Sequence, residues 1–258
     1  MRISSTAALI ASLALATTTF SSPILKRIVG GEPTKPGELP FAAKFKFRYG
    51  RCTGSLIGPQ TILTAAHCLK TSRFQYNAVE VAGMVFPSNE TTHVYHPQYD
   101  DKRNANDIGL VFLLKKLPGP YPQISSDYPQ PDSKIMAAGF GDVDNNGTET
   151  DVLRKVELTV EAKAVCLAKD DTFLSDTEFC TRDTPQSTCV GDSGGPLFVS
   201  EKENIRIVGI TSHGVKKDAC GLEGNYQYYT FVHPHMQWIN DAIARFEKNG
   251  TASTLQNS

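Results

Sequence analysis

The sequence predicts an all-β protein, a barrel or sandwich of short antiparallel strands with one helix at the C-terminus. Short β-rich runs recur along the chain, turn residues separate them, and helical spacing of apolar residues occurs only near the end. The 258 residues include 20 glycines and 15 prolines without a repeat, which is typical of a turn-rich β protein. With 40% hydrophobic residues, the chain has enough apolar content for a buried core.

The expected elements follow one another between clusters of Gly, Pro, Asn and Asp, such as Gly58-Pro59 and His96-Pro97. In the first run, Phe45 and Phe47 fall on one face and the intervening lysines on the other. The β-rich runs cover residues 41–47, 60–65, 108–114, 134–138, 152–160 and 205–211. The helix is expected over residues 235–247, with Met236, Ile239, Ile243 and Phe246 on one face.

Charge and hydropathy exclude two classes of partner. The 26 basic residues balance 27 acidic ones, for a formal net charge of −1, so we expect no nucleic-acid partner. The chain lacks an apolar stretch of about 18 or more residues, so we expect no membrane-spanning helix.

The N-terminus predicts secretion. Arg2 precedes a short apolar run, and Ala14-Leu15-Ala16 supplies small residues for cleavage, so residues 1–16 read as a signal peptide. A short buried or amphipathic helix is the alternative, but the Thr and Ser residues that follow would continue it poorly. Residues 17–27 then form an activation propeptide that ends in Lys26-Arg27, although such a basic pair can also be a surface turn.

Secretion predicts disulfide bonds between the cysteines and makes the sequons candidate glycosylation sites. In an oxidising environment the six cysteines are expected to pair, in any of 15 ways that the residues themselves leave open. A metal site is disfavoured because the cysteines are dispersed and form no Cys-x-x-Cys motif. The sequons at Asn89, Asn146 and Asn249 are candidate glycosylation sites.

Three segments carry candidate chemistry. In Gly191-Asp192-Ser193-Gly194-Gly195-Pro196, glycines on both sides of a serine permit a tight turn that exposes the hydroxyl and aims N–H groups at one point. His67 ends an apolar run, Leu63-Thr64-Ala65-Ala66, and stands beside a cysteine, and Asp107 begins another apolar run. Each would be an ordinary loop or core residue if it stood alone.

Together with Ile28-Val29-Gly30-Gly31, these segments resemble the chymotrypsin/trypsin family of serine proteases over residues 28–245. The order His, Asp, Ser is that of this family and differs from the order in subtilisin and in the α/β-hydrolases. A Gly-x-Ser-x-Gly motif, which would indicate an esterase or lipase, is absent around Ser193. The resemblance implies two packed antiparallel β-barrels over residues 28–130 and 131–247, the second including the terminal helix, and a polar tail over 248–258.

The resemblance also implies a role for each matching residue. Ser193 would attack the peptide carbonyl, His67 would accept and return its proton, and Asp107 would orient the imidazole. The N–H groups of Gly191 and Ser193 would form the oxyanion hole. The protein would thus be a secreted serine endopeptidase that acts on proteins or peptides without a cofactor or metal.

Activation and disulfide pairing are implied in the same way. Cleavage after Arg27 by another protease would free the Ile28 amine to pair with Asp192, so the chain would be a zymogen. The implied disulfides are Cys52–Cys68, Cys166–Cys180 and Cys189–Cys220. A monomer is expected, with protein inhibitors of proteases as further candidate partners.

The expected substrate pocket has an uncharged base, Ser187, which favours a large apolar or aromatic substrate residue. Its edge comprises Ser212, His213 and Gly214, and His213 stands where the family usually has tryptophan. Taking Tyr229 as the landmark tyrosine puts Gln227 at a pocket-wall position that is usually glycine. Taking Tyr226 instead restores Gly224 there but needs a later insertion, so the first register is preferred and even polar substrate residues remain candidates.

A catalytically inactive homologue that binds or inhibits other proteins is the alternative function. Such relatives usually lack a triad residue, whereas all three are present in this chain.

Overall fold

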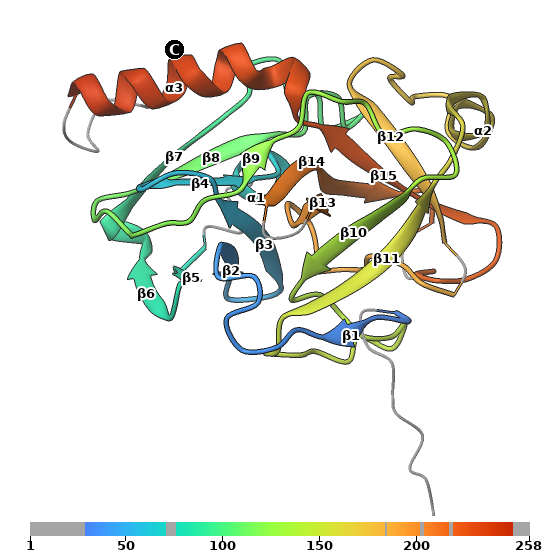
Figure 1. The fold of residues 1–258 in the computed structure, drawn as a ribbon, viewed down its shortest axis with the longest axis horizontal. Helices are drawn as coiled ribbons and strands as arrows, with labels where there is room; N and C mark the ends of the chain where they lie inside the picture. The colour runs from blue at the N-terminus through green and yellow to red at the C-terminus, as the bar shows by residue number, and fades with distance from the viewer. Residues whose placement is uncertain (1–28, 71–75, 184, 202–203, 217–218, 250–258) are drawn as a thin grey trace, which may run out of the picture.

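The computed structural model describes residues 29–70, 76–183, 185–201, 204–216 and 219–249. It consists of two antiparallel sheets packed side by side, with a helix lying across the first sheet (Figure 1). This architecture confirms the predicted all-β fold with a C-terminal helix. No helix among the described residues is long and apolar enough to span a bilayer.

The first sheet has the strand order β6-β5-β2-β3-β4-β8-β7. Alternate residues point to opposite faces of each strand, and the inward faces form one core that includes Phe45, Ile62 and Phe112. Its strands are β2 (Ala42–Lys46), β3 (Arg51–Leu56), β4 (Thr61–Thr64), β5 (Ala78–Val81), β6 (Met84–Pro87), β7 (Thr91–Tyr95) and β8 (Gly109–Leu113).

The second sheet follows the path β1-β11-β10-β13-β14-β15-β12, and a further pairing of β11 with β12 closes it into a ring. The short strand β9 joins it in parallel beside β14. Its strands are β1 (Glu32–Pro33), β9 (Gln123–Ile124), β10 (Lys134–Gly139), β11 (Arg154–Val160), β12 (Glu178–Asp183), β13 (Pro196–Glu201), β14 (Asn204–Gly214) and β15 (Asn225–Phe231).

Each of the six predicted β-rich runs overlaps one of these strands. The expected boundary near residue 130 falls between β9 and β10. The chain also crosses this boundary, because β1 and β9 precede residue 130 but pair with strands of the second sheet. These two strands tie the halves together.

The helices are short except for the last. They are α1 (His67–Lys70), α2 (Lys163–Lys169) and α3 (Met236–Asn249), with 3₁₀ turns at Ser88–Glu90 and His233–His235. The predicted apolar face of α3 packs on the first sheet, where Phe246 stacks on Phe112 at 4.5 Å between ring centroids.

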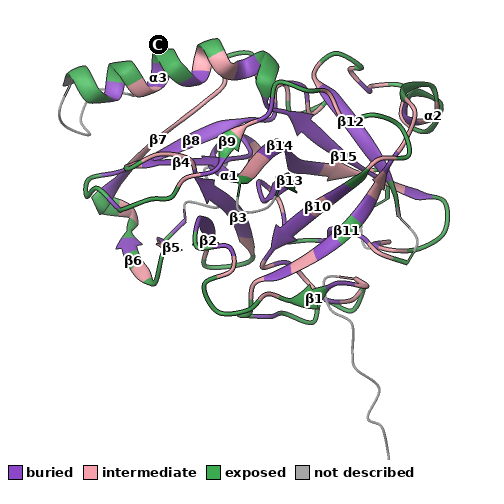
Figure 2. Ribbon diagram, in the orientation of Figure 1, coloured by how far each residue is buried: buried purple, intermediate pink, exposed green. Residues whose placement is uncertain are grey.

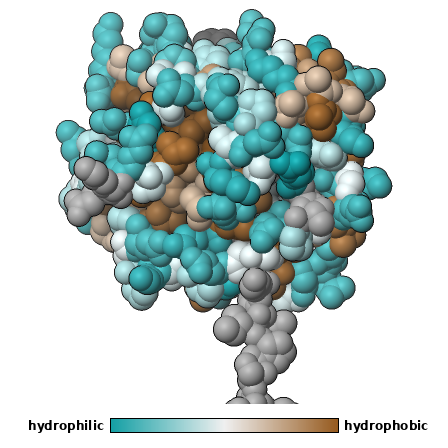
Figure 3. Space-filling view, turned by 45° about the vertical axis from the view of Figure 1, so that its right-hand side comes forward, coloured by the Kyte–Doolittle hydropathy of each residue, from teal (hydrophilic) through white to brown (hydrophobic). Residues whose placement is uncertain are grey.

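Burial follows the same layout. The strands of both sheets are mostly buried, whereas the outer face of α3 is exposed (Figure 2). The face seen in Figure 3 is largely hydrophilic, and apolar side chains gather near its centre and again toward its upper right. The loops at the junction of the two sheets carry the predicted chemistry.

Candidate active site

Asp107 lies two residues before the start of β8 and is fully buried. Its Oδ1 accepts a hydrogen bond from the His67 backbone N–H at 2.9 Å, and its Oδ2 lies 2.7 Å from His67 Nδ1. The Ser212 hydroxyl, from β14 of the other sheet, donates to the same Oδ2 at 2.6 Å. These three contacts fix the orientation of the His67 ring, which is 30% exposed.

The two groups perturb each other's pKa. Burial acts to lower the pKa of His67, but the charge and hydrogen bond of Asp107 raise it above its usual value. Burial acts to raise the pKa of Asp107, but the charge and hydrogen bonds of His67 and the hydrogen bond from Ser212 lower it. The pair is therefore built to keep the carboxylate ionised and to stabilise a proton on the imidazole.

The Gly191–Pro196 segment brings Ser193 to this dyad. The Ser193 carbonyl accepts the Thr53 N–H at 2.8 Å and lies 3.7 Å from Cys68 Sγ, next to His67 in the chain. Ser193 itself is half-buried. Within the described part of the chain, the N–H groups of Gly191 and Ser193 donate no hydrogen bond.

Gly191 must be glycine for two reasons. Its φ of +94° lies in the region that side chains rarely adopt, and a Cβ there would come within 2.7 Å of Arg51 Cγ.

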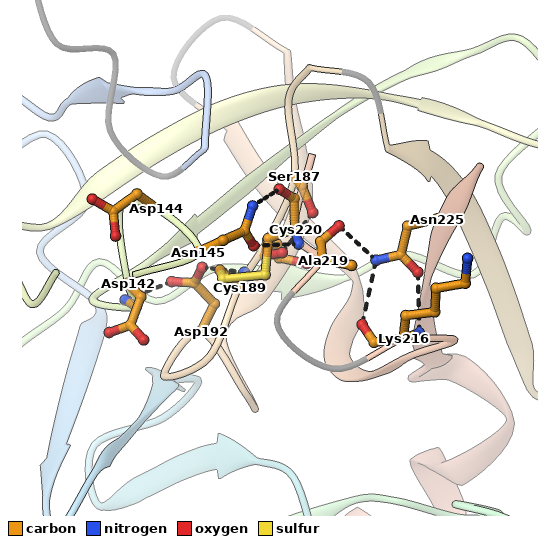
Figure 4. Close-up of a disulfide and its surroundings, with 12 residues drawn as sticks. Asp142, Asp144, Asn145, Ser187, Cys189, Asp192, Lys216, Ala219, Cys220 and Asn225 are labelled. Atoms are coloured by element: carbon orange, nitrogen blue, oxygen red, sulfur yellow. Dashed lines mark hydrogen bonds between the residues drawn. A yellow bond between two sulfur atoms is a disulfide. The ribbon is translucent and has the colours of Figure 1, made fainter. Parts of the chain in front are cut away.

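Asp192 is fully buried, and its two oxygens accept the N–H groups of Gly141 and Cys189 at 2.7 and 2.8 Å. Burial, only partly opposed by these bonds, raises its pKa to about 7. Figure 4 shows Asp192 beside Asp142 and the Cys189–Cys220 disulfide.

The predicted activation residues Arg27 and Ile28 lie outside the described residues. The next residue, Val29, is placed: its carbonyl accepts the Ser187 N–H at 2.9 Å. The start of the described chain is thus docked against the loop that carries the expected pocket base.

The expected pocket residues gather around β14 and β15. Ser187 is fully buried, and nearby the Tyr229 hydroxyl lies 3.1 Å from the hydroxyls of both Thr181 and Thr188. Gln227 pairs with Gly214 across the two strands, and its amide lies against that glycine: a Cβ on Gly214 would be 2.6 Å from Gln227 Nε2. Gln227 is buried, and its amide fills the space beside Gly214.

His213 stacks on Tyr228, with 5.0 Å between ring centroids and 10° between planes. Its Nδ1 lies 3.2 Å from Ser212 Oγ and its Nε2 lies 3.3 Å from Asp170 Oδ2. Burial lowers the pKa of His213 despite the nearby carboxylates Asp170 and Asp107. A chain of polar contacts thus runs from Asp107 through Ser212 to Asp170.

The structure joins Cys52 to Cys68, Cys166 to Cys180 and Cys189 to Cys220, which is the pairing that the resemblance implies. Asn145 braces the last bridge, because its side chain both donates to the Cys220 carbonyl at 3.0 Å and accepts the Cys220 N–H at 2.7 Å (Figure 4). In the described part of the chain, the one cluster with metal-ligand chemistry is Cys52, His67 and Cys68. Its two sulfurs are bonded to each other, so it offers no thiolate.

Two of the sequon residues, Asn89 and Asn146, are exposed, whereas the side chain of Asn249 is outside the described residues. The site predicted from the sequence does not include Arg51, Asp142, Asn145 or Asp170. Each meets its partner from a distant part of the chain, and only the adjacency of Arg51 to a cysteine could have drawn attention to one of them.

Comparisons with known proteins agree with this geometry. The family model described as Trypsin matches residues 28–239. The chain is 30% identical to serine protease 1 of Homo sapiens over 84% of this chain and 90% of that one, and 29% identical to duodenase-1 of Bos taurus over 87% and 92%. It is also 29% identical to mast cell protease 3 of Ovis aries, over 88% and 93%.

We expect the His67 ring to have a pKa above 6.5, because the Asp107 carboxylate favours its protonated form. His96 and His235 serve as internal controls, since burial lowers the pKa of both, that of His235 to about 4. Replacement of Asp107 by Asn should lower the pKa of His67 without moving that of His96. NMR titration of the ring resonances measures all three. A His67 pKa below that of His96 would contradict the ion pair.

Proposed function

The chain belongs to the trypsin family of serine endopeptidases, and we propose that it is a secreted member, made as an inactive precursor, that cleaves peptide bonds with Ser193, His67 and Asp107. The observation that carries the proposal is the Asp107 carboxylate, held by both the His67 ring and the Ser212 hydroxyl next to the Ser193 loop. Its substrates are proteins or peptides, as the family implies.

The proposed reaction is an acyl transfer through Ser193. Ser193 Oγ attacks the peptide carbonyl as its proton passes to His67 Nε2, and Asp107 stabilises the imidazolium that forms. The oxyanion would accept hydrogen bonds from the N–H groups of Gly191 and Ser193, and loss of one such donor typically costs about 3–4 kcal/mol. His67 then gives its proton to the leaving amine, and water releases the acyl group from Ser193 by the same steps in reverse.

The pocket favours an apolar side chain of limited length. Ser187 at its base carries no charge that could balance a buried Lys or Arg. The amide of Gln227 against Gly214 shortens the pocket and adds hydrogen-bonding groups to its wall. We therefore expect cleavage after Leu, Met or Phe.

Secretion and activation rest on the N-terminal sequence. A signal peptide over residues 1–16 would direct the chain into an oxidising compartment before it is removed, which suits three disulfides. Cleavage after Arg27 by a protease of different specificity would free the Ile28 amine one residue from the docked Val29. The exposed Asn89 and Asn146 are the glycosylation sites that we favour, and the enzyme is a monomer open to protein inhibitors.

Protein processed to a free Ile28 should cleave a peptide library after Leu, Met or Phe, and Ser193→Ala should abolish all cleavage. The cut sites are read by mass spectrometry. Cuts after Lys or Arg would keep the catalytic assignment and overturn the pocket assignment. No cuts by correctly processed protein would indicate an inactive homologue that acts by binding.

Replacement of Gln227 by Gly should deepen the pocket. We expect kcat/KM for a Phe substrate to rise relative to a Leu substrate by at least about tenfold, the scale of a changed pocket contact. Gln227→Asn, which keeps a shorter amide, should give an intermediate ratio. An unchanged ratio in both variants would place Gln227 outside the pocket.

An uncleavable Arg27→Gln precursor should have little activity, because Asp192 lacks the Ile28 ammonium. With the Asp192 pKa raised to about 7 from 3.8, its contribution to the free energy of unfolding is present in acid and is lost as pH rises toward and through 7. In processed protein the ammonium favours the carboxylate, so this loss should disappear.

Urea denaturation of both forms between pH 4.5 and 8 measures the difference. Asp192→Asn in the precursor is the control, since it removes the titrating group. A precursor as active as the processed protein would overturn the activation proposal.

A further inference from the structure

Arg51, at the start of β3, places a charged group in the protein interior beside the catalytic loop. Its side chain is only 7% exposed, and its guanidinium forms ion pairs with Asp142 and, at 3.3 Å, with Glu149. Its Nε–H is buried and has no partner among the described residues. Burial of a cation with one donor unsatisfied is a poor route to stability, which points to a role in the site.

The stem of Arg51 packs directly against Gly191. A Cβ on Gly191 would lie 2.7 Å from Arg51 Cγ and 2.8 Å from Arg51 Nε. Arg51 thus touches the residue whose N–H is proposed to bind the oxyanion, and it limits where that residue can move.

The ion-pair partner of Arg51 holds the same peptide from the other side. The Asp142 backbone N–H donates to the Val190 carbonyl at 2.7 Å. In a planar trans peptide the carbonyl and the following N–H point in opposite directions, so a fixed Val190 carbonyl fixes the direction of the Gly191 N–H. The Gly191 carbonyl is fixed in turn by the Thr53 hydroxyl at 3.0 Å.

We propose that Arg51 is a positioning residue for the oxyanion hole, which it keeps formed by anchoring Asp142 and by packing on Gly191. The proposal rests on the proposed proteolytic function. Asp142 holds the Val190 carbonyl, and Arg51 holds Asp142, so loss of the guanidinium releases the peptide that presents the Gly191 N–H. The two acidic partners come from the segment after β10, and Figure 4 shows Asp142 beside the buried Asp192 of the catalytic loop.

The test compares processed wild type with Arg51→Met, which keeps an unbranched stem against Gly191 but lacks the charge. We expect kcat to fall about 10- to 100-fold, with KM changed less than about twofold, because the oxyanion forms only after substrate has bound. Affinity for a peptide aldehyde, whose adduct with Ser193 places an oxyanion in the hole, should fall in parallel with kcat. A merely structural role would not link these two quantities.

Three further variants sharpen the test. Arg48→Met removes the same charge from an exposed position on the same hairpin and should match wild type. Arg51→Lys should recover part of kcat. Asp142→Asn should reduce kcat like Arg51→Met, and the double variant should lose little more than either single one, because both act through one contact. Asp142→Asn also serves if Arg51→Met fails to fold.

This proposal would be overturned, and the proteolytic function kept, if wild type is active and both Arg51→Met and Asp142→Asn keep kcat and aldehyde affinity within twofold of it. Equal losses in Arg48→Met and Arg51→Met would also overturn it, since a general charge effect would then explain both. Wild type that neither cleaves peptides nor binds the aldehyde would overturn the proposed function and this inference with it.

Discussion

The buried carboxylate of Asp107 is the constraint on which the arrangement of the two sheets depends. An ionised group without water must find hydrogen-bond donors inside the protein. Asp107 finds them on both halves of the molecule, since His67 follows β4 of the first sheet and Ser212 lies on β14 of the second. Thr230 of β15 adds a third link by donating to the Asp107 carbonyl at 3.0 Å. Any shift between the sheets would break hydrogen bonds to a charge that cannot reach solvent. The geometry of the site therefore depends on the packing of the two halves.

The Ser193 loop also contains a buried acid, whose hydrogen-bond donors come from the backbone. Its buried acid, Asp192, accepts two backbone N–H groups, and its donors Gly191 and Ser193 remain unused within the described chain. Both N–H groups are therefore available to an oxygen atom of a ligand. The loop can therefore bind a ligand oxygen. Its glycines leave it flexible, and in our proposal its neighbours, chiefly Arg51 and Asp142, make it rigid.

The sequence predicted the parts of this protein that depend on neighbouring residues. The Gly-rich turn around Ser193 and the apolar runs beside His67 and Asp107 are local patterns, and the amphipathic spacing of α3 is another. The six predicted runs leave out the remaining strands, which are β1, β3, β5, β6, β7, β9, β12, β13 and β15. Strand β15 shows no alternation because it buries polar residues, Asn225 and Gln227 among them. Arg51 and Asp142 are 91 residues apart, so their contact exists only after the sheets have formed. Local patterns therefore define the chemistry, whereas its supports emerge from the fold.

The polar contacts that run from Asp107 through Ser212 and His213 to Asp170 limit where hydrogen atoms can lie. Ser212 has one hydrogen and gives it to Asp107, so its oxygen is left as an acceptor toward His213 Nδ1. Burial acts to raise the pKa of Asp170, but the hydrogen bonds from Thr172, together with the charge and hydrogen bond of His213, lower it, so the carboxylate is an acceptor toward Nε2. Both contacts of His213 are hydrogen bonds only in the imidazolium; the neutral ring satisfies one and leaves the other as two facing lone pairs. Because burial lowers the pKa of His213 and so favours the neutral ring, the position of one hydrogen atom decides which of its two contacts is a hydrogen bond.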